Sequence, residues 1–194
     1  MNELVPRTDD VIQSAFILAG ERHSQSLAAA EVSEVLRSDE LGWVHLRAQH
    51  PDTPAWIVEN LSYLDPTIID ALVAEETRPR VTRVGDGLIV ILRGINTIEG
   101  QDPEDMVSVR MWIDPYRIVS LARRKVRAIE EIAPELEHGR GPCDCAEFLV
   151  TLVERLTQRI ERHWNSIDDL ADDLEEAVLD EAGPDVRTTL VDLR

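Results

Sequence analysis

Short segments in which apolar and polar residues alternate recur along the first part of the chain, up to about residue 140. A period of two is typical of a strand that buries one face. In residues 41–47, Val44 and Leu46 point to one side while Trp43 and His45 point to the other, which predicts a half-buried strand. The same reasoning predicts strands over residues 11–19, 80–84, 88–95, 106–113 and 117–122.

Helical spacing and helix-start signals lie between these strands. Asp65-Pro66 is typical of a helix start, because aspartate caps the first turn and the missing N–H of proline costs nothing there. Gly85-Asp86-Gly87 is a strong hairpin signal. Helices are predicted over residues 28–36, 51–63, 66–75 and 124–137. Together these elements predict an α/β (α+β) domain with a mixed, largely antiparallel sheet covered by helices.

A different pattern follows residue 141, because residues 146–179 contain neither proline nor glycine. Steps of three and four residues separate the apolar positions Leu149, Leu152, Leu156, Ile160, Ile167, Leu170, Leu174 and Val178, when His163 is counted between Ile160 and Ile167. This spacing predicts one stalk-type helix of about 50 Å, whose apolar face packs on another helix or subunit. Residues 185–194 begin a further helical pattern at which the sequence stops. We therefore expect an α/β domain over residues 1–140 and a helical segment over 141–194, in a fragment of a longer protein.

Composition narrows the classes of function. The chain has 194 residues, with 38 aspartates and glutamates against 20 lysines and arginines, and its formal net charge is -18. Binding to nucleic acid requires a basic surface, so the sequence predicts no nucleic-acid partner and favours cations. No apolar run approaches the ~20 residues that span a bilayer. Common catalytic motifs such as Gly-x-Ser-x-Gly, the P-loop and His-Glu-x-x-His are absent from the sequence, which predicts that the chain is not an enzyme.

Acidic residues crowd the end of the long predicted helix, where eight carboxylates and no basic residue lie between positions 168 and 181. The candidate cation ligands are Asp168, Asp169, Asp172, Asp173 and Glu176. Oxygen ligands suit Mg²⁺ or Ca²⁺ better than Zn²⁺. The alternative is a solvated, charged helix face that binds no ion tightly, and both interpretations stay open.

A second candidate set is Cys143 and Cys145, whose sulfur atoms suit Zn²⁺, together with His163 in the apolar face of the long helix. A complete set of four ligands is not evident, so incidental cysteines and a packed histidine are the alternatives. No cofactor is firmly indicated, and Zn²⁺ and Mg²⁺ are the candidate ions. The basic residues within 123–127 are predicted to pair with neighbouring carboxylates.

Several motifs follow one another in a specific order. They are Glu-Glu-Thr-Arg-Pro-Arg at residues 75–80, the segments 87–96 and 103–112, the basic run 123–129 and the heptad-patterned helix. This order resembles the cytoplasmic N-terminal domain of the CorA-like metal ion transporters, and among them it is most similar to the ZntB-type zinc transporters. The resemblance implies long helices that feed a stalk, and five subunits that form a funnel. It also implies two membrane spans and a Gly-Met-Asn pore motif, neither of which this sequence contains.

The resemblance further implies the cytoplasmic domain of a divalent cation transporter, with Zn²⁺ as the expected ion. This domain would form the intracellular funnel and sense cations. The full-length protein would be a homopentamer in the inner (plasma) membrane, with this domain in the cytoplasm. The alternative is a soluble acidic module that uses its heptad-patterned helix to oligomerise or to bind a partner.

Overall fold

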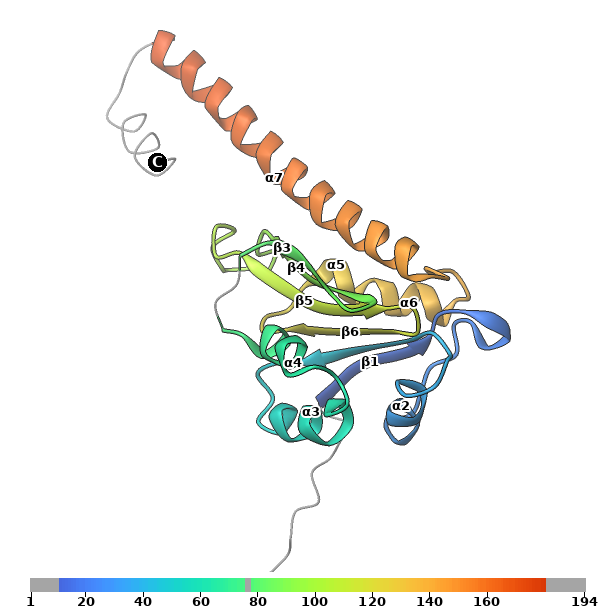
Figure 1. The fold of residues 1–194 in the computed structure, drawn as a ribbon. Helices are drawn as coiled ribbons and strands as arrows, with labels where there is room; N and C mark the ends of the chain where they lie inside the picture. Colours follow the sequence, from blue (N-terminus) through green and yellow to red (C-terminus); the bar gives the residue numbers. More distant parts are fainter. Residues whose placement is uncertain (1–10, 76–77, 181–194) are drawn as a thin grey trace, which may run out of the picture. The chain divides into compact units, whose positions relative to one another are not determined.

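A computed structural model of the chain describes residues 11–75 and 78–180, with side chains through residue 176. The described residues contain a mixed sheet of six strands in the order β1-β2-β6-β5-β4-β3 (Figure 1). Neighbouring strands are antiparallel except β2 and β6, which run parallel. The strands are β1 (Ile12–Ile17), β2 (Gly42–Arg47), β3 (Arg80–Val84), β4 (Gly87–Gly94), β5 (Val107–Asp114) and β6 (Arg117–Ala122). The predicted α/β class and the mixed, largely antiparallel sheet are confirmed.

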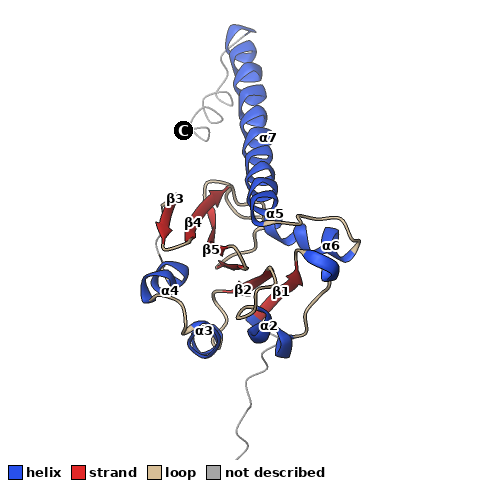
Figure 2. Cartoon of the chain, turned by 45° about the vertical axis from the view of Figure 1, so that its right-hand side comes forward, coloured by secondary structure: helices blue, strands red, loops and turns tan. Residues whose placement is uncertain are grey.

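Helices cover both faces of the sheet (Figures 1 and 2). One face packs against α2 (Ala29–Val35), α3 (Thr53–Leu61) and α4 (Pro66–Val73). The other packs against α5 (Arg127–Glu130), α6 (Ile132–Glu137) and the first turns of α7 (Cys145–Asp180). A short 3-10 helix, η1 (Gly20–Arg22), follows β1. The Asp65 side chain accepts a hydrogen bond from Thr67 N at 2.7 Å, which confirms the predicted cap of α4.

The prediction that β2 is half-buried is wrong, because helices cover this strand on both faces. Val44 belongs to the core cluster beneath α2, α3 and α4, whereas Trp43 belongs to the cluster beneath α6 and α7. Trp43 Nε1 donates to Ser120 Oγ at 2.9 Å, and His45 Nδ1 lies at 2.9 Å from the same oxygen. Ser120 itself donates to the Val44 carbonyl, so its oxygen accepts from both rings. The polar ring atoms of Trp43 and His45, which led us to predict an exposed face, therefore have a hydrogen-bond partner inside the protein.

The single helix predicted over residues 124–137 is also wrong in detail, since the chain forms two short helices, α5 and α6, that meet at Glu131. Pro134 explains the break, because proline has no N–H to donate to the carbonyl four residues earlier and its ring crowds that carbonyl. The first helix starts at Arg127 because the residue before it, Val126, is extended and buried.

The long helix predicted over residues 146–179 is confirmed as α7, which has 36 residues and, at 1.5 Å per residue, a length of about 54 Å. The chain divides into two compact units, Met1–Leu156 and Thr157–Arg194, and the boundary between them falls within the sequence of this helix. Phe148, Leu152 and Leu156 pack in the core of the first unit. The predicted domain boundary at residue 140 stays a prediction, and the predicted last helix over 185–194 lies outside the described residues. Among the described helices, none combines the length and apolarity that a membrane span needs.

Candidate functional site

The candidate cation ligands of the acidic cluster lie on α7. Asp168, Asp169, Asp172, Asp173 and Glu176 are all exposed. Among the side chains described through residue 176, no three of these carboxylates bring ligand oxygens within 4.8 Å of one another. The cluster therefore forms a charged helix surface in a single chain, and its role in cation binding stays a prediction.

The cysteine pair is separated by the start of α7. Cys143, Asp144 and Glu147 are exposed and bring one ligand atom each within 4.8 Å of one another. Glu147 N donates to Asp144 Oδ1 at 2.8 Å, and the Glu147 carboxylate accepts from Cys143 N at 2.9 Å. These bonds satisfy free N–H groups at the helix start, in the manner of a capping box. Helix capping thus accounts for the grouping without a metal ion.

Cys145 points away from that group, because its thiol donates to the Asp114 carbonyl at 3.3 Å. Burial, followed by the nearby Asp114 and Asp144, raises the pKa of Cys145 to about 11. A hydrogen bond with Glu147 and partial desolvation raise the pKa of Cys143 as well. Zinc binds the thiolate form, so neither sulfur is prepared as a ligand in this state. His163 is half-buried and lies in the second compact unit, and its proposed metal role stays a prediction.

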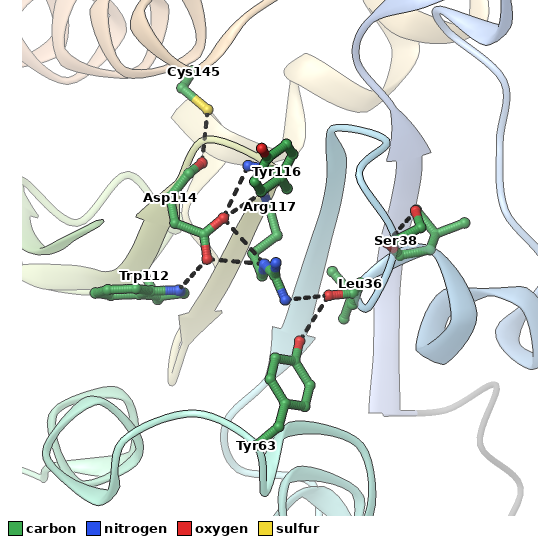
Figure 3. Close-up of polar contacts among 9 residues, drawn as sticks. Leu36, Ser38, Tyr63, Trp112, Asp114, Tyr116, Arg117 and Cys145 are labelled. Carbon is green, nitrogen blue, oxygen red and sulfur yellow. Dashed lines mark hydrogen bonds and ion pairs between the residues drawn. The ribbon is translucent and has the colours of Figure 1, made fainter. Parts of the chain in front are cut away.

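The carbonyl that Cys145 contacts belongs to a polar network at the β5–β6 turn (Figure 3). The Asp114 carboxylate accepts from Trp112 Nε1 at 3.0 Å and from Arg117 Nε at 2.9–3.1 Å. Arg117 and the Tyr63 hydroxyl both donate to the Leu36 carbonyl at the end of α2. This Asp114 network joins the central sheet to α2, to the chain after α3 and to the start of α7.

The basic run after β6 pairs with carboxylates, as predicted. Arg123 contacts Glu75 at 3.1 Å, Arg124 contacts Asp105 at 3.2 Å, and Lys125 contacts Glu130 at 3.5 Å. Each pair is largely exposed, so each contributes little stability.

The register of the sheet gathers arginines that lie far apart in the sequence. Arg80 stands opposite Ile91, which stands opposite Arg110. Arg93 stands opposite Ser108, two positions along the same strands. Directly opposed residues share a face, so the three arginines project from one face, the one on which Ile91 packs beneath α4. The alternation of apolar and polar residues in β5 predicts correctly which face Arg110 lies on. The sequence does not show how the strands pair, so the cluster of Arg80, Arg93 and Arg110 was not predicted.

Comparisons with known proteins identify the family of this chain. A family model described as "CorA-like Mg2+ transporter protein" matches residues 38–194. The zinc transport protein ZntB of Enterobacter sp. (strain 638) is 34% identical over 170 residues, which cover 88% of this chain and 51% of that protein. The chain thus spans about half the length of this curated relative.

Solved structures agree with this match. The cytoplasmic domain of ZntB from Vibrio parahaemolyticus superposes with a TM-score of 0.71 at 25% identity, covering 84% of this chain and 65% of that chain. Full-length CmaX superposes with a TM-score of 0.78 at 31% identity, covering 95% of this chain and 57% of that chain. The CorA magnesium transporter of Methanocaldococcus jannaschii, at 15% identity and a TM-score of 0.68 over 92% of this chain and 55% of its own, shares the fold. The chain belongs to the family of CorA-like Mg²⁺ transporter proteins.

Proposed function

We propose that this chain is the cytoplasmic domain of a membrane transporter for divalent cations, with Zn²⁺ as its cargo. The observation that carries the proposal is the 34% identity to a zinc transport protein across 88% of the chain. The likeness to a ZntB cytoplasmic domain supports the same assignment. The domain has no catalytic role in this proposal, and the full-length protein lies in the inner (plasma) membrane with this domain in the cytoplasm.

The domain forms the wall of an intracellular funnel in a homopentamer, and α7 forms its stalk. Three large apolar side chains on α7 support association, since Ile160, Trp164 and Leu170 are 40%, 65% and 41% exposed in a single chain. Exposed apolar groups of this size on one helix are typical of a surface that another protein surface covers. Pairing of the stalk helices removes these side chains from water.

The acidic residues of α7 attract cations to this stalk. Asp168 and Asp172, like Asp169 and Asp173, are four residues apart on the helix, and each such like-charged pair costs ~0.2–0.5 kcal/mol. Divalent cations that gather along the helix reduce this repulsion, and more so where neighbouring subunits add their own carboxylates. Cation sensing follows if the assembled and separated states differ in cation affinity.

Metal content of cells tests the proposal. Cells that express the full-length gene product should change their zinc content, measured by mass spectrometry, relative to cells with an empty vector. Zinc content equal to that of the vector control would contradict it. If the natural chain carries no membrane span and purifies as a dimer, the alternative of an acidic interaction module is correct.

A further inference from the structure

The arginines gathered by the sheet register line a cavity of about 610 Å³. It lies at the end of the sheet where β4 ends, β5 begins and β6 ends, and Glu75 and Arg78 also line it. Among the residues that the structure describes, one acidic residue, Glu75, lines it. The lining arginines are Arg78, Arg80, Arg93, Arg110, Arg123 and Arg124. Six guanidinium groups around one space are unexpected in a chain whose net charge is -18.

Arg110 is the innermost of these residues and is 2% exposed. Its Nη2 donates to the Glu75 carbonyl at 3.2 Å, but its Nε and Nη1 are buried without a hydrogen-bond partner among the described residues. Burial, followed by the charge of Arg123, lowers the pKa of Arg110. A buried guanidinium with two unpaired donor atoms is costly, and an anion in the cavity would satisfy them.

Carboxylates balance only part of the positive charge of the other arginines that line the cavity. Arg123 pairs with Glu75 and Arg124 pairs with Asp105. Within the described residues, no carboxylate pairs with Arg80 or Arg93, which project from the same face as Arg110. Three guanidinium groups on one face thus keep donors for a ligand.

We propose that this cavity binds an anion that carries two or more phosphate groups. The guanidinium fork matches phosphate oxygens, and one phosphate, with ~1.5–2 negative charges, cannot balance the unpaired arginines. The volume lies within the ~300–1,000 Å³ of small-molecule sites. No aromatic side chain of the described residues lines the cavity, so a nucleotide base would find no stacking partner there and the phosphate chain carries the binding. This site is independent of the proposed cation transport.

Isothermal titration calorimetry of the metal-free 194-residue chain tests the proposal with sodium tripolyphosphate, ATP and inorganic phosphate at constant ionic strength. Tripolyphosphate should bind with a Kd at least about tenfold lower than that of phosphate. ATP binding as tightly as tripolyphosphate identifies nucleotides as a source of the ligand, whereas weaker ATP binding identifies free polyphosphate.

Substitutions of two exposed arginines, compared with one matched control, test whether binding occurs in this cavity. Arg80→Gln and Arg93→Gln should each raise the Kd for tripolyphosphate about tenfold, since each loses a charge-assisted hydrogen bond. Arg83→Gln removes the same charge from β3 but on the opposite face, outside the cavity, and should change the Kd by less than about twofold. Arg110→Gln should abolish binding; if it does not fold, the exposed variants decide alone.

Three results would overturn the proposal. They are the absence of saturable tripolyphosphate binding, an equal effect of Arg83→Gln and Arg93→Gln, and equally tight binding of chloride in the same buffer. The last two would reveal general attraction of anions rather than recognition of phosphate groups.

Discussion

Replacing Phe148 with alanine tests whether the start of α7 is part of the folded domain. Phe148 is fully buried, and its ring lies 5.0 Å from that of Trp43 at a tilt of 58°. Truncation of a buried phenylalanine typically costs ~3–5 kcal/mol, of which a tilted aromatic pair supplies ~0.5–1.5 kcal/mol. We therefore expect Phe148→Ala to lower the free energy of unfolding by about 4 kcal/mol.

Urea unfolding followed by circular dichroism measures this loss. In thermal unfolding of a domain of this size, a loss of about 4 kcal/mol in stability lowers the Tm by roughly 8–16 °C. Val150→Ala is the matched control, because Val150 lies on the same turns of α7 and is 54% exposed, so its effect should stay within about 0.5 kcal/mol. Equal, small effects of the two substitutions would refute the packing of the first turns of α7 against the sheet.

Three further predictions concern charge. Burial lowers the pKa of His45 to about 4, so the unfolded chain binds a proton that the folded chain does not. Stability should therefore fall as the pH drops from about 6.5 to 4, by about 3 kcal/mol at most, and His45→Gln should flatten this slope in urea titrations. Asp114→Ala should cost about 3 kcal/mol in thermal unfolding, because it leaves the half-buried Arg117 without its ion-pair partner; a loss below about 1 kcal/mol contradicts the role of the network. Added Mg²⁺ or Zn²⁺ should raise the assembly state in light scattering or the Tm, and no response to either ion argues against cation sensing.

Local signals in the sequence predict most of the fold correctly. Asp65 and Pro66 mark the start of α4 because capping depends on residues within one turn. The alternation of β5 and the glycines of the β3–β4 turn act over similarly short distances. The interior of the sheet was harder to predict. A histidine and a tryptophan on one face of β2 look exposed until Ser120, from a strand far along the chain, supplies their hydrogen-bond partner.

Candidate sites depend still more on such distant pairings. Composition draws attention to the acidic end of α7, where the carboxylates are neighbours in sequence and stay exposed on the helix. The arginine cavity has no such local signal, because Arg80, Arg93 and Arg110 come from three strands and meet only through their register. In a chain with 38 acidic residues, a site for anions could not be predicted from composition.

Flux of Zn²⁺ into proteoliposomes tests the central claim most directly. The full-length gene product, reconstituted with a zinc-sensitive dye inside the vesicles, should admit Zn²⁺ faster than vesicles without protein. Flux equal to that of empty vesicles, from protein that is folded and inserted, would contradict the assignment of this domain to a divalent cation transporter. Flux of Mg²⁺ but not Zn²⁺ would keep the transporter and overturn zinc as its cargo.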